Sequence, residues 1–507
     1  MITIKSYLAV CAYLILLFTP AAALAGNTHL TKTPHRPGQT VPTATVSLLT
    51  TTSPTAEAGV DVMLLMDSSG SMKRTDPRNY RRDAAKLFIS LLGKEDRIGV
   101  MSFGDDATLL LPLTQNTEAG RKDLFGAVTK ITSKEFSTNI TAAVQKGLDE
   151  LKTSRKQQRM LIMMSDGKLA LGTKERDDAA LAALNMLLPE LAKANIKLYA
   201  VAFTGESDRV LLEKMAQDTG GFFRFAREDK DMHVMFASIF EKIKSPDTIP
   251  FEGESFTIDH EISEATVLVT KKSGTRLSLM DPSNKKNTAV RHTANIVWFE
   301  SSVFDMITIQ EPLAGTWSVK LSMNEGNKVY ILTNLSLKTS FDKSFANRGA
   351  GIVIDAWLDK QGGTVTEKDL LESTTFSAEI TGPDNKTVKY DLLSSASSTV
   401  IMPVVGKYSA TIPVDAGGEY TVKLQAQGKT FKRVKLVPFT AVDPPAAPPV
   451  ERKQAPLPAL VQTTHAEAEI HWMTVLLRLG LVNLVVVILA AGGSILRKKT
   501  FRKREQQ

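Results

Sequence analysis

The feature that most constrains the fold is a short apolar run, Val60 to Met66, followed at once by the sequence Asp-Ser-Ser-Gly-Ser at 67–71. The run is continuous and has no helical period, which predicts a β-strand that is buried on both faces. The glycine lets the chain bend sharply after the strand. In such a bend Asp67, Ser69 and Ser71 can turn a carboxylate and two hydroxyl groups toward one point, a ligand set suited to Mg²⁺ or Ca²⁺ rather than to zinc. Aspartate and serine are also common turn residues, so this motif alone does not establish a metal site.

Two later stretches place further oxygen ligands beside other predicted elements. Thr138 lies just before an amphipathic run, residues 142–151, and therefore belongs to a loop that leads into a helix. Asp166 follows a second apolar run, residues 160–164, and precedes a glycine. These three motifs, in this order, resemble the metal-ion-dependent adhesion site of the von Willebrand factor A domain family. The resemblance covers roughly residues 59–245.

The resemblance implies a fold and a complete metal site. The fold is an α/β domain with a doubly wound, mostly parallel sheet. In the family, the serines and the threonine bind the cation directly and the aspartates act largely through water. The expected ion is Mg²⁺, with Mn²⁺ or Ca²⁺ as alternatives, and neutral hydroxyl ligands leave it able to attract a carboxylate from a protein partner. The five positions that match are Asp67, Ser69, Ser71, Thr138 and Asp166.

The two ends of the chain predict export and anchoring in a membrane. Residues 1–25 have the lysine, the apolar run and the Ala-x-Ala end of a signal peptide, and they contain the only cysteine, Cys11. Residues 472–496 are long and apolar enough to cross a bilayer as one helix. The tail, 497–507, carries six positive charges and one negative charge, or +5 of the net +8, which predicts a cytoplasmic location. Most of the net positive charge therefore marks the cytoplasmic end of the chain, and no nucleic-acid partner is predicted. The lack of cysteine in the exported part favours a bacterial inner-membrane protein.

After residue 245 the pattern changes from alternating strands and helices to residues that alternate with a period of two. This pattern predicts two all-β, sandwich-like domains, of which the second resembles immunoglobulin-like modules of bacterial surface proteins. The predicted boundaries are 1–25 for the signal peptide, 26–57 for a flexible lead-in, 58–245 for the A domain, 246–343 and 344–441 for the two β domains, 442–471 for a Pro/Ala-rich stalk, 472–496 for the transmembrane helix and 497–507 for the tail.

No catalytic set stands out in the sequence. The seven histidines are scattered, without His-Glu-x-x-His spacing, and there is neither Gly-x-Ser-x-Gly nor a thiol after residue 25. We therefore predict a binding protein rather than an enzyme: a membrane-anchored, extracytoplasmic protein that binds a protein partner through a divalent cation. Calcium-channel auxiliary subunits and chloride-channel regulators also combine an A domain with an anchor, so a regulatory subunit of a membrane transport or envelope complex is the main alternative. A metal-dependent hydrolase is the weaker one, and the sequence identifies neither the partner nor the oligomeric state.

Overall fold

The computed structural model describes residues 59–394 and 405–444, together with 473, 476–478 and 480–481. The predicted signal peptide (1–25), lead-in (26–57) and cytoplasmic tail (497–507) lie outside the described residues, as do most of the stalk (442–471) and nearly all of the predicted membrane span (472–496). Among the residues that are described, no helix has both the length and the apolar character needed to cross a membrane.

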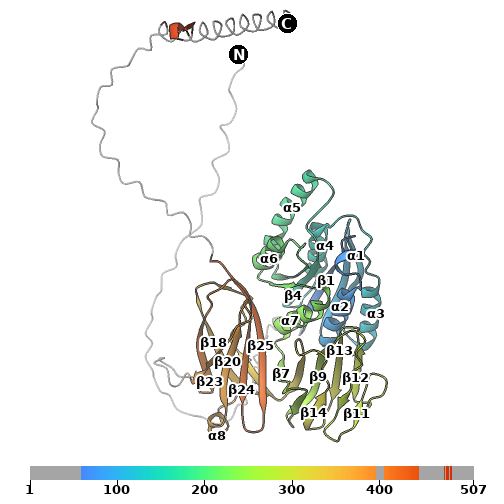
Figure 1. Ribbon diagram of the computed structural model, residues 1–507, viewed down its shortest axis with the longest axis vertical. Helices are drawn as coiled ribbons and strands as arrows, with labels where there is room; N and C mark the ends of the chain where they lie inside the picture. Colours follow the sequence, from blue (N-terminus) through green and yellow to red (C-terminus); the bar gives the residue numbers. More distant parts are fainter. Residues whose placement is uncertain (1–58, 395–404, 445–472, 474–475, 479, 482–507) are drawn as a thin grey trace, which may run out of the picture.

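Residues 60–244 form the predicted α/β domain, here called the A domain (Figure 1). Its six-stranded sheet has the order β3-β2-β1-β4-β5-β6, in which only β3 runs antiparallel to its neighbour. The strands are β1 (Val60–Asp67), β2 (Arg97–Phe103), β3 (Ala107–Gln115), β4 (Gln158–Ser165), β5 (Ile196–Phe203) and β6 (Phe222–Ala226). The helices are α1 (Met72–Thr75), α2 (Tyr80–Leu91), α3 (Glu118–Thr129), α4 (Ile140–Lys152), α5 (Lys174–Lys193), α6 (Arg209–Asp218) and α7 (Met232–Lys244), with a 3₁₀ turn, η1 (Asp229–Asp231), before α7.

Strand β1 lies in the middle of the sheet, and every residue in it is buried. Successive side chains point to opposite faces, so Leu64 joins the core under α2, α3 and α7 while Leu65 joins the core under α4, α5 and α6. This placement confirms the doubly buried strand and the doubly wound fold that the sequence predicts. It also fixes the residues that follow β1 at the carboxyl edge of the sheet, where ligand sites of such folds lie.

Between residues 245 and 444 the described chain is mainly β, as predicted, with one short helix, α8, and its strands build three sheets. A ten-stranded sheet has the order β12-β13-β9-β15-β7-β25-β24-β20-β21, with β17 beside β25; a four-stranded sheet is β11-β10-β14-β8, and a five-stranded sheet is β16-β18-β23-β22 with β19 beside β18. The elements are β7 (Asp247–Ile249), β8 (Ser255–Ile258), β9 (Ile262–Thr270), β10 (Leu279–Met280), β11 (Lys286–Asn287), β12 (Ile296–Glu300), β13 (Phe304–Gln310), β14 (Gly315–Val319), β15 (Lys328–Thr333), β16 (Leu335–Thr339), β17 (Phe345–Asn347), β18 (Gly351–Lys360), β19 (Gly363–Thr364), α8 (Lys368–Glu372), β20 (Thr375–Thr381), β21 (Thr387–Asp391), β22 (Leu393–Ser394), β23 (Lys407–Pro413), β24 (Gly418–Gln427) and β25 (Lys432–Val442).

The two β units have separate apolar cores but share the ten-stranded sheet. They are joined where Thr248 of β7 pairs with Val434 of β25. The boundary differs from the predicted 343/344, because β16 pairs with β18 of the second unit and Leu337 packs in the second core. The first unit therefore ends near residue 334. The period-two pattern marks each strand but does not say which sheet the strand joins.

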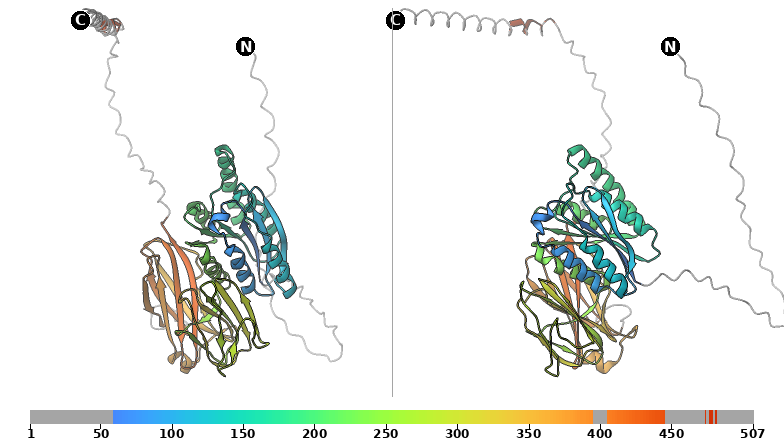
Figure 2. Two further views of the ribbon diagram at one scale, coloured as in Figure 1. Left: turned by 45° about the vertical axis from the view of Figure 1, so that its right-hand side comes forward. Right: turned by 90° about the vertical axis from the view of Figure 1, so that its right-hand side faces the viewer.

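Helix α7 lies between the A-domain sheet and the first β unit (Figures 1 and 2). Its Phe236 packs edge-on against Phe88 of α2, and its Phe240 packs edge-on against Tyr330 of β15. Leu268 and Phe304 of the β unit belong to the same buried cluster as the A-domain residues. The A domain and the first β unit therefore share one continuous core across α7.

Candidate metal centre

The five predicted site residues all lie at the carboxyl edge of the A-domain sheet. Asp67 is the last residue of β1, and Asp166 follows the last residue of β4. Because β1 and β4 are parallel neighbours, with Met66 paired to Met164, the two carboxylates reach the same edge. Ser69 and Ser71 lie in the loop after β1, and Thr138 lies in the loop between α3 and α4.

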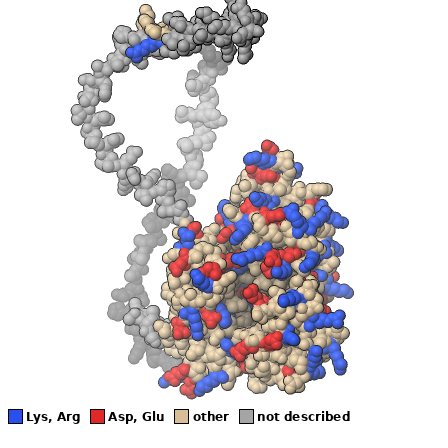
Figure 3. All heavy atoms as spheres, in the orientation of Figure 1, with Lys and Arg blue, Asp and Glu red and all other residues tan. Residues whose placement is uncertain are grey.

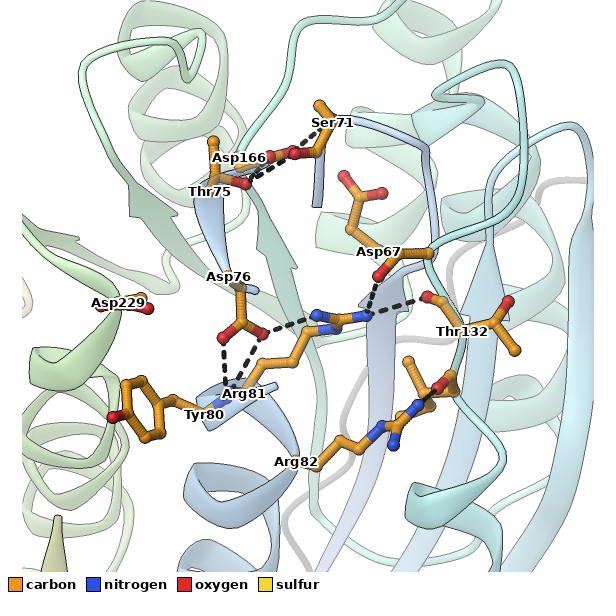
Figure 4. Close-up of polar contacts among 12 residues, drawn as sticks. Asp67, Ser71, Thr75, Asp76, Tyr80, Arg81, Arg82, Thr132, Asp166 and Asp229 are labelled. Carbon is orange, nitrogen blue, oxygen red and sulfur yellow. Dashed lines mark hydrogen bonds and ion pairs between the residues drawn. The ribbon is translucent and has the colours of Figure 1, made fainter. Parts of the chain in front are cut away.

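Hydrogen bonds connect four of these residues directly. The Ser71 hydroxyl donates to Asp166 Oδ1 at 2.9 Å, and the hydroxyl oxygens of Ser69 and Ser71 are 2.9 Å apart. Asp67 Oδ1 accepts the Ser69 backbone N–H at 2.8 Å, while its Oδ2 accepts the Ser165 hydroxyl at 2.6 Å. Figure 4 shows Ser71 and Asp166 in contact, with Asp67 below them on the adjoining strand. The loop after β1 is thus closed onto the carboxylates that follow β1 and β4.

Thr138, the fifth residue, comes to the site on a loop that is held at several points. Its backbone exchanges hydrogen bonds with Ala170, of 2.9 and 3.3 Å, and the next residue, Asn139, donates from its backbone N–H to Gly104 O at 2.8 Å. The hydroxyls of Thr138 and Ser71 both lie beside Gly167, since a Cβ placed there would be 3.4 Å from Thr138 Oγ1 and 4.0 Å from Ser71 Oγ. The structure therefore brings all five predicted residues together.

The negative charge of the two carboxylates at this site is not balanced by any positive side chain that the structure describes. Asp67 and Asp166 are both fully buried. Burial, together with the nearby Asp166 carboxylate, raises the pKa of Asp67 to about 6, and burial also raises the pKa of Asp166. Within the described residues neither carboxylate has a lysine or arginine partner.

The donor set fits a hard divalent cation. Two carboxylates and three hydroxyls are oxygen ligands of the kind that Mg²⁺, Mn²⁺ and Ca²⁺ prefer. In the part of the chain that the structure describes, no three His, Cys, Asp or Glu side chains are grouped to hold a metal. Hydroxyl groups would therefore have to supply most of the protein ligands of a cation at this edge.

Sequence reasoning missed two hydroxyls that orient the carboxylates. Thr75 in α1 donates to Asp166 Oδ2 and, at 3.2 Å, to Ser71 O, while Ser165 donates to Asp67. Ser165 directly precedes Asp166, so the adjacent pair at the end of a strand was a usable signal. Thr75 is the last residue of α1, four residues after Ser71. This helix has only four residues, so it shows no periodic pattern in the sequence.

A buried arginine holds the loops behind the site (Figure 4). Arg81 is fully buried and lies 2.6 Å from Asp76 Oδ2. It donates to Thr132 O at 2.9 Å and to Ser133 Oγ at 2.8 Å. Asp76 in turn accepts the Tyr80 backbone N–H at 2.7 Å, at the start of α2. This network fixes α2 to the beginning of the loop that carries Thr138.

The outer rim of the site presents one apolar side chain. Phe136 is 97% exposed, although its loop is well held: the backbone N–H groups of Phe136 and Ser137 donate to Asp105 Oδ1 at 3.2 and 2.8 Å. A hydrogen bond from the Ser137 side chain, together with these two backbone hydrogen bonds, lowers the pKa of Asp105, whereas a hydrogen bond with Asp105 raises the pKa of Glu135. Glu135 donates from its backbone N–H to Ser68 O at 3.1 Å, in the loop after β1. A rigid loop therefore holds an aromatic ring in solvent beside the metal-site residues.

Comparison with known proteins agrees with this domain assignment. Residues 61–241 match the family model of the von Willebrand factor type A domain, which confirms the predicted family for this segment. Human inter-alpha-trypsin inhibitor heavy chain H4 is 22% identical over 209 residues, which cover 39% of this chain and 22% of that relative. Heavy chain H3 of Pongo abelii is 24% identical over 202 residues, 37% of this chain and 21% of the relative. The match thus spans about a fifth of the length of these relatives.

Two solved structures are also similar. A von Willebrand factor type A protein from Catenulispora acidiphila is 14% identical, with 61% of this chain and 64% of that chain covered and a TM-score of 0.33. Proximal thread matrix protein 1 from the mussel byssus, solved with a zinc-occupied MIDAS motif, is 16% identical, with 37% and 48% covered and a TM-score of 0.30.

Proposed function

We propose that the A domain binds a divalent cation, preferentially Mg²⁺, and through it a protein partner that supplies a carboxylate. Asp67, Ser69, Ser71, Thr138 and Asp166 would hold the cation. The observation that carries this proposal is the pair of buried carboxylates, Asp67 and Asp166, which share one edge of the sheet with three hydroxyls and have no cationic partner among the described residues. A divalent cation would offset this charge, which the protein itself leaves uncompensated.

The partner would contribute an acidic residue because the hydroxyl ligands are neutral. A cation held largely by hydroxyl groups keeps much of its positive charge and would take a carboxylate from outside as a ligand. Acidic and basic side chains are mixed over the middle of the face drawn in Figure 3, and basic side chains predominate along its right-hand edge. Such charge could attract an acidic partner, but specific recognition would depend on the metal rim.

Phe136 would provide an apolar contact beside the metal. Its ring is exposed and its loop is already ordered by Asp105, so binding would order little additional chain. Aromatic residues that bind without loss of conformational freedom often dominate interface energetics. We therefore expect the partner to place an apolar side chain next to its acidic residue.

We further propose that the chain is exported and anchored in a bacterial inner membrane, with the A domain and the β units outside the cytoplasm. The apolar run at 472–496 and the basic tail after it support this topology. The main alternative, a regulatory subunit of a membrane transport or envelope complex, is favoured by one contact: α7 shares its core with the first β unit. A change in the position of α7 would therefore be felt by the β units.

The metal proposal is tested by calorimetry on the full chain in detergent, titrated with Mg²⁺, Mn²⁺ and Ca²⁺. Wild type should bind at least one ion, and Asp67→Ala should bind none, because it removes a charged member of the site. Asp149→Ala is the matched control: it removes the same charge from α4, where the side chain is 58% exposed. Thr138→Ala should weaken binding without abolishing it, by about tenfold for the loss of one neutral oxygen. Equal binding by wild type and Asp67→Ala would show that the loop is an ordinary turn.

A further inference from the structure

At the edge of the A-domain sheet opposite the metal site, the structure contains a basic pocket of about 280 Å³. It is lined by the first residues of β4 and β5, by the last turn of α7 and by Asp342, which follows β16. Three cationic side chains face it, Arg159, Lys197 and Lys242, and each comes from a different element. The pocket therefore lies where the A domain meets the β region.

The three cations differ in burial: Arg159 and Lys242 are partly buried, whereas Lys197 is exposed. Within the described residues none of them forms a salt bridge. The Arg159 Nη2 donates to Ala194 O, but its buried Nε has no hydrogen-bond partner in the described part of the chain. Among the residues that the structure describes, Lys242 Nζ donates only to the backbone oxygen of Asp342. A buried donor without a partner is costly, so the Arg159 Nε is placed for an acceptor that the described part of the protein does not supply, and Lys197 and Lys242 line the same pocket.

The neighbouring Lys244 shows that these cations could have been paired. Both lysines lie in the last turn of α7, where positive charge is favourable because of the helix dipole. Lys244 lies 2.7 Å from Asp96 Oδ1. Lys242 instead faces Lys197, Arg159 and Arg224, with Asp342 as the acidic side chain of the pocket. Burial and the positive charge of Lys197 and Arg224 lower the pKa of Lys242 to about 7.

We propose that this pocket binds a phosphate-type oxyanion. Three cations less one carboxylate leave a formal charge of +2, which matches a phosphate or phosphomonoester dianion. The guanidinium of Arg159 suits two oxygens of such a group, and the two ammonium groups suit the others. The ligand would be free inorganic phosphate or a phosphomonoester headgroup of a lipid, since both present the same chemistry. Its occupancy would join β4, β5 and α7 to the segment at Asp342.

The test is calorimetry on the full chain in detergent with two probes, inorganic phosphate and soluble dihexanoyl phosphatidic acid. Wild type should bind at least one, and binding should be accompanied by proton uptake near pH 7.5, because the anion returns Lys242 to its charged form. The uptake is measured by repeating the titration in buffers of different ionisation enthalpy. Binding of phosphate alone would assign the pocket to a free anion, whereas tighter binding of the lipid would assign it to a headgroup.

Variants locate the binding. Lys242→Gln and Arg159→Gln should each weaken it by about tenfold or more, as expected for the loss of a charged hydrogen bond. Lys242→Arg, which keeps the charge, should retain most of the affinity. Lys193→Gln, at the exposed end of α5, is the control and should change nothing. Chelation of divalent cations should also have no effect, which separates this site from the metal rim. If neither probe binds, or if Lys242→Gln and Lys193→Gln bind equally, the proposal is wrong.

Discussion

The carboxyl edge of the A-domain sheet and the α7 face, where α7 packs against the first β unit, both contain buried charged side chains. The two regions differ in whether these side chains have partners of opposite charge. At the carboxyl edge, Asp67 and Asp166 are buried without a cationic partner among the described residues. On the α7 face, Glu241 is equally buried, but it accepts hydrogen bonds from Lys328 and, at 2.9 Å, from Tyr330 Oη, both in β15. The same kind of side chain is therefore left uncompensated in one region and fully paired in the other.

This difference separates binding from assembly. A buried pair is expensive to break, because removing one member leaves the other without compensation. A buried carboxylate without a cationic partner has the reverse property, since removing its charge relieves the folded protein. Substitutions in the two regions should therefore change stability in opposite directions.

The largest effect is expected on the α7 face. Glu241→Ala should lower the free energy of unfolding by about 3–5 kcal/mol, because it leaves Lys328 and Tyr330 without their shared acceptor. Urea denaturation of the full chain in detergent measures it. The control is Glu190→Ala, whose carboxylate is 54% exposed and pairs with Lys152, and which should cost less than about 1 kcal/mol. A similar loss from both variants would remove the distinction between the two regions.

A second effect on the same face depends on pH. His233 of α7 is buried against Phe304, with Nε2 at 3.0 Å from Thr270 Oγ1 and Nδ1 at 2.7 Å from Lys230 O, and burial lowers its pKa from 6.5 to about 4. Between these values the unfolded chain binds the proton more readily, so stability is present above pH 6.5 and is lost as the pH falls. At pH 5 the loss should be about 2 kcal/mol.

The comparison with His233→Gln isolates this contribution. The glutamine variant should show a weaker loss of stability between pH 7 and pH 5, because it has no imidazole to protonate. The charge of Lys328 acts on residue 233 in both proteins, and Asp67, with its pKa raised to about 6, contributes with the opposite sign in both. Identical pH profiles would show that the histidine is not held neutral by the interface.

At the metal edge, substitution of a buried carboxylate should raise the free energy of unfolding instead of lowering it. Asp67→Asn keeps a side chain of the same shape and removes the charge. Its oxygen can still accept the Ser69 N–H, and the Ser165 hydroxyl can rotate to accept from the new amide N–H, so the metal-free protein should become more stable by about 1 kcal/mol. The same variant should lose the rise in melting temperature that Mg²⁺ gives to wild type, because ligand binding stabilises only the protein that binds it. Thermal unfolding with chelator and with Mg²⁺ measures both. A less stable metal-free variant would contradict the view that Asp67 is uncompensated.

The smallest change in stability is expected at the rim. Phe136→Ala should alter the free energy of unfolding by less than about 0.5 kcal/mol, because the ring is 97% exposed. Its effect should appear in binding. Peptides selected from a displayed random library in Mg²⁺ should carry an acidic residue beside an apolar one with wild type, and should lose the apolar preference with Phe136→Ala. Val290→Ala, 97% exposed in the first β unit, is the control. An unchanged preference would exclude Phe136 from the contact surface.

The residues of the candidate site could be predicted from the sequence, whereas the contacts around them could not, because the site residues lie within a few positions of recognisable strands. Asp67 ends one buried strand, Ser69 and Ser71 follow within four residues, and Asp166 follows another strand, so the parallel sheet alone brings them together. The supporting contact of Arg81 with Thr132 spans 51 residues and leaves no mark on the sequence near either one. The same holds for the pairing of Thr248 with Val434, which joins the β units through a strand of only three residues.

That pairing has a mechanical consequence. Strand β25 is the last strand of the described chain, yet it lies beside β7, which directly follows the A domain. Lys435 of β25 donates to Ser245 O at the end of α7, and Arg433 binds Asp259 in the first β unit at 2.6 and 3.0 Å. A pull on the chain beyond residue 444 would therefore reach the base of the A domain through β25 itself, without first unravelling the β units. The shared sheet thus shortens the path along which a pulling force is transmitted. The force would act on α7 and on β7 at the same time.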